Sequence, residues 1–303
     1  MLYFKNPEQA LPVFKALSSE VRLKILNIIS ENEGKNLNEI AQMLSLTNSA
    51  ISTHINKLLE ADLIEIHSVS GTRGSMKICK PKHNNLIVEL QPSITQENCY
   101  HQDIRIGHYT ACQVKPTCGL ATVNGLIGEF DDPRYFYFAQ RFEASVLWFS
   151  SGYIEYNIPN DLKAGERLVE LQLSFEISSE APGFQDVYPS DIYFSVNDVP
   201  LGYWGSPGDY GSKRGRFNPS WYPDGNNQYG LLKMLIVNKN GTFIDGSTKI
   251  SDTTIDDLHI DYSHPITLRF SNPEDTRNPG GFTIFGAGFG NHNQSIKAKL
   301  LYE

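Results

Sequence analysis

LTNSAISTHINKLLEADLIEI, residues 46–66, is the stretch that decides the fold of the N-terminal part of this chain. Its apolar residues Ile51, Ile55 and Leu58 recur at three- and four-residue intervals, which is the period of one buried helix face. We expect this helix to begin near Thr47 and to expose a face of mostly short polar side chains. That face comprises Asn48, Ser49, Ser52, Thr53, Asn56 and Lys57.

Two further helices are predicted before this stretch. Val21 and Ile25 belong to the apolar face of a helix that ends around residues 31–34. A shorter helix follows, with Asn36 as its N-cap and Ile40 and Leu44 on its buried side. The sequence therefore indicates a bundle of short helices whose last member is the polar-faced one.

A basic β-hairpin is predicted directly after the helices. Residues 64–69 and 75–80 alternate in polarity on either side of the glycine-bracketed turn 70–74. A polar helix N-terminus suits the major groove of DNA, and a basic hairpin beside it suits the flanking backbone. We therefore expect double-stranded DNA binding. The hairpin residues expected at the DNA are Thr72, Arg73 and Lys77.

Residues 16–82 resemble the ArsR/SmtB family of winged-helix regulators. The matching segments are ALSSEVRLKIL (16–26), NEIA (38–41), LTNSAISTHI (46–55) and LLEADLI (58–64). The resemblance implies a homodimer that binds an inverted-repeat operator, with half-sites about one helical turn (~34 Å) apart.

The chain departs from the family at two places. Metal-sensing members have closely spaced cysteines where this chain has residues 37–40, LNEI, so thiolate metal sensing does not carry over. The family's C-terminal dimerisation helix is also not indicated, because residues 86–90 are typical of a strand. We expect dimer contacts from a first helix around Leu11, Val13 and Phe14 and from the large C-terminal domain.

Composition divides the chain near residue 97. Only three of its 34 aromatic residues and three of its 24 glycines lie before that point. Residues 1–82 carry ten Lys and Arg against eight Asp and Glu, which leaves 16 against 26 for residues 83–303. The acidity therefore lies away from the DNA-binding segment, where local charge decides affinity for phosphates.

The second part of the chain is predicted to be all-β. Short apolar and aromatic runs such as DIYFSV (191–196) and ITLRF (266–270) alternate with Gly, Pro, Asn and Asp turns. Its pattern resembles a jelly-roll, galactose-binding-like sandwich. The expected fold class is thus an α+β multidomain protein, with a winged helix-turn-helix at residues 1–82, a strand and linker at 83–98, and a β-sandwich at 99–303.

We expect the β-sandwich to sense a small polar ligand, a carbohydrate, through the stretch 190–230. A sugar stacks its C–H faces on aromatic rings and needs directed hydrogen bonds for its hydroxyls. A purely structural role for the same residues is the alternative, because aromatic side chains fill β cores and Asn and Asp make turns. The candidate ligand residues are Trp204, Asp209, Tyr210, Arg214, Arg216, Trp221, Tyr222, Asp224 and Asn227.

Other chemistries are weaker in this sequence. No metal site or cofactor is expected, although three cysteines and two histidines within 20 residues offer weak zinc candidates. No catalytic residue is assigned, although Glu129, Asp131 and Asp132 could serve a carbohydrate-active enzyme. The zinc candidates are Cys99, His101, His108, Cys112 and Cys118.

The sequence as a whole predicts a cytoplasmic, homodimeric regulator, a repressor, that has no membrane partner. No apolar run approaches the ~20 residues that a membrane-spanning helix needs, and the N-terminus shows no secretory signal. A regulator whose β domain binds a protein partner is the first alternative, and an enzyme with a DNA-binding appendage is the second.

Overall fold

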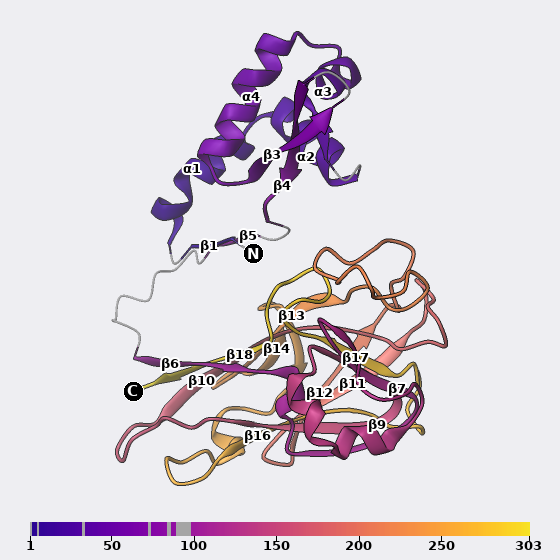
Figure 1. The fold of residues 1–303 in the computed structure, drawn as a ribbon. Helices are drawn as coiled ribbons and strands as arrows, with labels where there is room; N and C mark the ends of the chain where they lie inside the picture. The colour runs from indigo at the N-terminus through magenta and orange to yellow at the C-terminus, as the bar shows by residue number, and fades with distance from the viewer. Residues whose placement is uncertain (1, 5, 32–33, 72–73, 84–85, 89–97) are drawn as a thin grey trace. The chain divides into compact units, whose positions relative to one another are not determined.

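The computed structural model describes residues 2–4, 6–31, 34–71, 74–83, 86–88 and 98–303 (Figure 1). The chain divides into two compact units, Met1–Gln96 and Glu97–Glu303. The predicted fold class is confirmed, since a helical domain with a hairpin precedes a large antiparallel β domain. None of the helices in the described ranges is long and apolar enough to cross a membrane.

The described part of the N-terminal domain contains four helices: α1 (Pro7–Leu17), α2 (Glu20–Glu31), α3 (Leu37–Leu44) and α4 (Asn48–Glu60). Local caps explain where they begin and end. The Asn36 side chain accepts from the Glu39 backbone N–H and the Glu39 carboxylate accepts from that of Asn36, which is a capping box. The buried Arg22 guanidinium donates to the carbonyls of Lys15 and Ala16 at the end of α1, which satisfies acceptors that the helix leaves open.

The wing is a three-stranded sheet in the order β2 (Lys35–Asn36), β4 (Gly74–Pro81) and β3 (Ile64–Gly71). A second, two-stranded sheet pairs β1 (Leu2–Phe4) in parallel with β5 (Leu86–Val88). The strand expected within 86–90 is therefore present. Its partner β1 was not predicted, because three residues paired with a segment more than 80 positions away leave no local pattern.

The β domain contains thirteen strands among its described residues. Four short 3-10 helices accompany them: η1 (Ile106–His108), η2 (Pro133–Tyr137), η3 (Ala139–Glu143) and η4 (Asp256–Leu258). The strands are β6 (Cys99–Ile104), β7 (Ala111–Thr122), β8 (Gly125–Leu126), β9 (Val146–Ile158), β10 (Leu168–Ser178), β11 (Ser190–Val196), β12 (Val199–Ser206), β13 (Leu231–Asn238), β14 (Gly241–Ile244), β15 (Thr248–Ser251), β16 (Ile266–Asn272), β17 (Phe282–Phe285) and β18 (Ile296–Tyr302).

These strands form two layers that are joined along one seam (Figure 1). One layer follows the order β12-β11-β16-β9-β7-β8, and the other follows β15-β14-β13-β10-β18-β6. Strand β17 pairs with β9 on one side and with β10 on the other, so it links the layers. Ile266, Leu268 and Phe270 alternate along β16 into the core between the layers and are fully buried.

A second, smaller apolar cluster positions the candidate site. Along β17, Phe282 and Ile284 belong to the main core, whereas Phe285 belongs to a separate cluster with Trp148, Tyr222 and others. Since successive strand residues face opposite sides, this cluster lies on the other face of β17. Residues 207–230, which connect β12 to β13 without regular secondary structure, supply Tyr222 to it. The stretch 190–230 is thus a β11–β12 hairpin followed by a long connecting segment.

Candidate functional site

The polar face predicted for residues 48–57 lies on one helix, α4. Its N-cap Thr47 accepts a hydrogen bond from the Ala50 backbone N–H at 3.3 Å. Ile51, Ile55 and Leu58 are buried in the domain core. On the opposite side, Asn48, Ser49, Thr53, Asn56 and Lys57 are exposed, and Ser52 is half-buried.

Lys77 is exposed on β4 of the wing, where it pairs with Ser68 of β3. Thr72 and Arg73, predicted at the hairpin tip, lie outside the described residues. An exposed helix face that starts at a capped N-terminus can offer backbone and side-chain donors to nucleic-acid phosphates and base edges. The described residues therefore form a candidate nucleic-acid interface.

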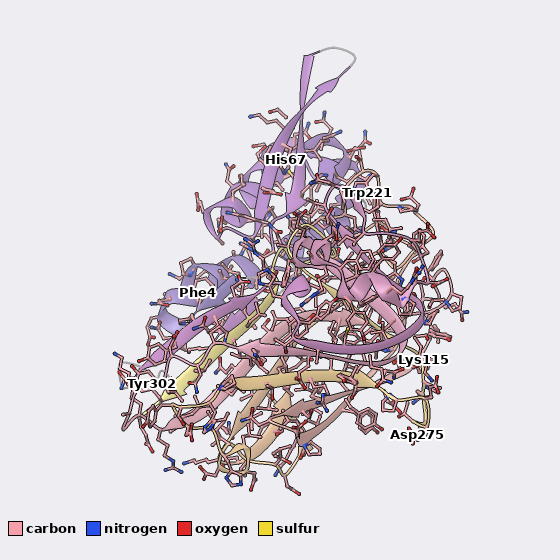
Figure 2. The ribbon with its side chains drawn as sticks, turned by 60° about the horizontal axis from the view of Figure 1, so that its bottom comes forward. Phe4, His67, Lys115, Trp221, Asp275 and Tyr302 are labelled. Atoms are coloured by element: carbon pink, nitrogen blue, oxygen red, sulfur yellow. The ribbon has the colours of Figure 1, made fainter. Side chains whose placement is uncertain are left out.

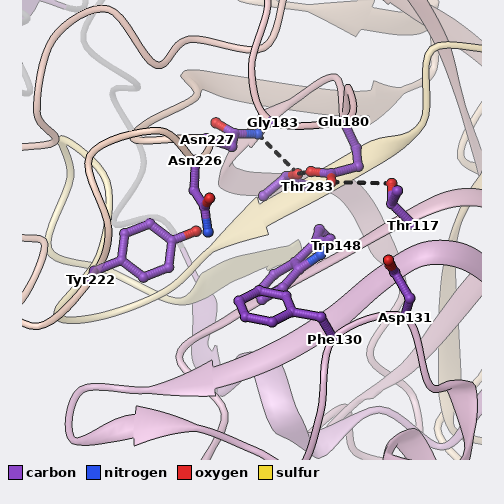
Figure 3. Close-up of a pocket in the computed structure, with 10 residues that line it drawn as sticks. All are labelled: Thr117, Phe130, Asp131, Trp148, Glu180, Gly183, Tyr222, Asn226, Asn227 and Thr283. Carbon is purple, nitrogen blue, oxygen red and sulfur yellow. Dashed lines mark hydrogen bonds between the residues drawn. The ribbon is translucent and has the colours of Figure 1, made fainter.

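The β domain contains a pocket of about 150 Å³ on the face of β17 that carries the second apolar cluster (Figure 3). It lies where β7, β9 and β17 run side by side and β10 ends. Six separate segments of the chain contribute to it. The lining residues are Thr117, Phe130, Asp131, Trp148, Glu180, Gly183, Tyr222, Asn226, Asn227 and Thr283.

One side of the pocket is aromatic. Trp148 lies against the bare backbone of Gly119, where an added Cβ would come within 2.3 Å of the indole ring. A glycine at 119 therefore leaves the space that the indole occupies beside β7. Phe130 is tilted by 42° to Trp148 with ring centroids 6.0 Å apart, and it is 53% exposed. Together they form an apolar platform that solvent reaches from the Phe130 side.

The facing side is polar, and Glu180 is at its centre (Figure 3). The Glu180 carboxyl accepts from the Thr283 hydroxyl at 3.0 Å and from the Thr117 hydroxyl at 3.3 Å. Burial raises the pKa of Glu180 well above its usual range, and the carboxyls of Asp209 and Asp131 raise it further. The pocket thus holds an acidic group that readily keeps its proton.

Two buried acceptors near Glu180 lack hydrogen-bond partners among the described residues. Asn227 is 4% exposed; its amide nitrogen donates to the Ser178 hydroxyl at 2.8 Å, and its side-chain oxygen has no partner. One oxygen of Asp209 accepts from the Ala181 backbone N–H at 2.7 Å, and the other is unpaired. Burial raises the pKa of Asp209 to about 7. Buried acceptors without donors are costly, and of these two residues Asn227 lines the pocket.

The structure brings only part of the predicted ligand set to this pocket. Tyr222 and Asn227 line it, and the Tyr222 hydroxyl lies toward the Asn226 side chain (Figure 3). Asp209 does not line the pocket, although its carboxyl is close enough to raise the pKa of Glu180. Arg214 pairs with Asp224 and donates to the Tyr222 carbonyl at 3.0 Å, so this ion pair shapes the segment that carries Tyr222.

The remaining predicted ligand residues make structural contacts outside the pocket lining. Trp221, which is labelled in Figure 2, donates its indole N–H to the Val123 carbonyl at 2.7 Å. The Tyr210 ring stacks on Tyr229 at 5.2 Å. Trp204 lies on β12 with the Lys233 ammonium 4.8 Å from its ring, and the Arg216 guanidinium lies 5.5 Å from the ring of Phe217.

Sequence reasoning missed the pocket residues outside the 190–230 stretch: Thr117, Phe130, Trp148, Glu180, Gly183 and Thr283. Asn226 lies within the stretch but is not among the predicted ligand residues. Of the three carboxylates considered for catalysis, Asp131 lines the pocket. Asp132 instead caps η2 and pairs with Arg134, and Glu129 is exposed and does not line it.

The weak zinc candidates do not gather at one point. On β6, the Cys99 thiol lies 3.3 Å from the His101 imidazole. Cys112 and Cys118 are buried on β7, where burial raises the pKa of the Cys118 thiol to about 12, and His108 is exposed at the end of η1. Within the described ranges, no three His, Cys, Asp or Glu side chains form a group that could hold a metal ion.

Two comparisons with known proteins bear on the N-terminal domain's architecture. Residues 19–65 match the model of a family described as bacterial regulatory protein, arsR family. The chain is also 33% identical over 75 residues to an uncharacterised HTH-type transcriptional regulator of Methanocaldococcus jannaschii. That alignment covers 25% of this chain and 78% of the relative.

Proposed function

Since the chain belongs to the arsR family of bacterial regulatory proteins and is thereby a DNA-binding transcriptional regulator, we propose that the pocket of its β domain binds the regulatory signal, a carbohydrate. One observation carries this proposal. The aromatic platform of Trp148 and Phe130 faces a wall of buried hydrogen-bonding groups around Glu180 and Asn227. Such a pairing suits a ring with apolar C–H faces and hydroxyls at its edge.

On the DNA side, we propose that α4 enters the major groove of an inverted-repeat operator as part of a homodimer, in the cytoplasm. The exposed residues Asn48, Asn56 and Lys57 would reach base edges and phosphates. Leu11 and Phe14 on α1 are 48% and 39% exposed and are available for dimer contacts, whereas Val13 is buried in its own domain. We propose repression as the default state.

Ligand control needs only a modest coupling between the two sites. The carbohydrate must favour one DNA-binding state over the other, since equal affinity for both would change nothing. A tenfold change in operator affinity corresponds to about 1.4 kcal/mol.

A calorimetric titration of the full chain with a panel of mono- and oligosaccharides tests the proposal. Phe130→Ala removes an exposed pocket residue and should weaken binding of any active sugar by about tenfold or more, which is ~1.4 kcal/mol. Phe138→Ala is the matched control, because Phe138 is similarly exposed, at 48%, and does not line this pocket. Absence of binding by every sugar, or equal losses in both variants, would contradict it.

A protein partner for the β domain is the second candidate function. The 3-10 helices η2 and η3 and the residue between them expose three aromatic side chains: Tyr137 at 68%, Phe138 at 48% and Phe142 at 48%. Neighbouring exposed aromatic residues are typical of protein-binding surfaces. Cross-linking in cells should then give a defined adduct that is lost in Tyr137→Ser, and its retention would contradict this alternative.

A further inference from the structure

The carboxyl groups around the pocket have no cationic partner in its lining. Glu180 and Asp131 line the pocket, and Asp209 lies close enough to raise the pKa of Glu180. None of the ten lining residues is Lys, Arg or His. Glu180 and Asp209 are 8% and 0% exposed. Buried carboxyls are ordinarily paired with a cation or kept protonated, because an isolated buried charge is very costly.

Arg214, on the segment that supplies Tyr222 to the pocket, is already engaged. Arg214 pairs with Asp224 and donates to the carbonyls of Pro219 and Tyr222. Its hydrogen-bond donors are therefore used by acceptors of residues 219–224, and it does not neutralise Glu180. Burial raises the pKa values of Glu180 and Asp209 in the free protein, and a cation that enters the pocket would stabilise the ionised form of Glu180, which lines it.

The pocket's aromatic rings favour an organic cation over a bare metal ion. Trp148, Phe130 and Tyr222 line the same cavity as the carboxyls. An ammonium group is attracted both to carboxylates and to the faces of aromatic rings, and a sugar ring stacks on the same rings. Asn227 lines the same pocket, and its side-chain oxygen has no hydrogen-bond partner among the described residues.

We propose that the carbohydrate recognised by this pocket carries a protonated amine, so that the ligand class is an amino sugar. The inference rests on the proposed function and narrows it. The ammonium group lies against the carboxyl side of the pocket, and the sugar ring lies on the Trp148 and Phe130 platform. Phosphorylated and carboxylated sugars are rejected, because they would bring negative charge next to Glu180 and Asp131.

Matched sugar pairs test this inference by calorimetric titration of the full chain at pH 6.5. The pairs are glucosamine and glucose, galactosamine and galactose, and mannosamine and mannose, with the N-acetyl form of each amino sugar as its uncharged control. In at least one pair the amino sugar should bind tenfold or more tightly than both uncharged forms. Neutral binding as tight or tighter overturns the amino-sugar inference and leaves carbohydrate sensing standing. No binding by any neutral, amino or N-acetyl sugar overturns both.

A carboxamide variant supplies the second arm. Asp131→Asn keeps the oxygen that accepts the Cys118 backbone N–H at 2.9 Å and removes the charge. It should weaken amino-sugar binding by about tenfold while changing binding of the uncharged partner less than twofold. Asp132→Asn, one residue away and outside the pocket lining, should alter neither. An equal loss for charged and uncharged sugars in Asp131→Asn would overturn the role of the charge.

Discussion

The two candidate surfaces of this protein are built in opposite ways. The residues of the candidate DNA-reading face all lie within positions 48–57 of a single capped helix. The pocket collects residues between 117 and 283 from six segments. A surface on one helix follows from local periodicity, whereas a pocket across several strands depends on long-range pairing. The first is therefore visible in a sequence and the second is not.

The substitution with the largest expected effect tests whether the two domains fold independently of each other. Phe270 is fully buried in the β core and contacts the rings of Tyr156, Phe175, Phe194 and Phe282. Phe270→Ala should lower the unfolding free energy of the β domain by about 3–5 kcal/mol. Chemical denaturation measures the loss, and a gel shift should show unchanged ligand-free operator affinity. A parallel loss of DNA binding would show that the domains are not independent.

The pH dependence of stability should also separate the domains. Burial raises the pKa of Glu176 from 4.5 to about 7 and that of Asp209 from 3.8 to about 7. Because these folded-state values lie above the unfolded ones, the stability they contribute is full at low pH and is lost as pH rises through 7. Each of these two groups should therefore cost the β domain about 2–3 kcal/mol of unfolding free energy between pH 5 and pH 8.

In the N-terminal domain, the pH dependence of stability that Asp62 contributes has the opposite sign. Hydrogen bonds from Lys82 and His83 lower the pKa of Asp62, so its contribution is present above its unfolded pKa and is lost only as pH falls through the lower folded value. The contribution of Asp62 to the unfolding free energy of this domain should therefore stay constant between pH 6 and pH 8. Urea denaturation, followed by probes placed in each domain, measures both. Glu176→Gln should make the unfolding free energy of the β domain depend less steeply on pH. An unchanged dependence would contradict its assignment to buried carboxyls.

The aromatic platform gives a smaller effect. Gly119→Ala places a Cβ within 2.3 Å of the Trp148 ring and should destabilise the β domain by about 1–3 kcal/mol, with loss of sugar binding. Gly125→Ala is the control, because nothing lies within 4 Å of the position that its added Cβ would take. Thermal unfolding and titration measure the two effects. Equal behaviour of the two variants would argue against a platform that depends on Gly119.

The smallest expected effect is a single phosphate contact. Lys57→Ala should weaken operator binding by about 0.5–1 kcal/mol and reduce the slope of log affinity against log salt by about 1. Lys239→Ala, which removes an exposed lysine between β13 and β14, should leave both unchanged. Fluorescence anisotropy over a salt series measures them. A salt slope that Lys57→Ala does not change would remove α4 from the proposed interface.

Much of the fold could be predicted from the sequence because its determinants are local. The helix periodicity, the Asn36 cap, the Thr47 cap and the hairpin all act within a few residues. The alternating strands likewise predicted an all-β domain. The pairing of β1 with β5, and of β17 with both layers, joins distant segments and could not be predicted.

The pocket shows the same limit. Tyr222 and Asn227 were predicted because aromatic and amide residues are dense around them. Trp148 stands in an apolar strand, where an aromatic residue ordinarily indicates core, and nothing in its neighbourhood points to Gly119 across the pairing of β7 and β9. Trp204 and Trp221 were predicted to bind ligand because they lie in the same aromatic-rich and amide-rich stretch. They instead make structural contacts within the β domain.

The short strand β17 has a mechanical consequence. Thr283 pairs in register with Trp148 of β9 on one side and with Ser178 of β10 on the other, so the pocket straddles the joint between the two layers. A molecule that binds there would contact residues of both layers, and its affinity would depend on the spacing between them. By reciprocity, a ligand that prefers one spacing fixes that spacing.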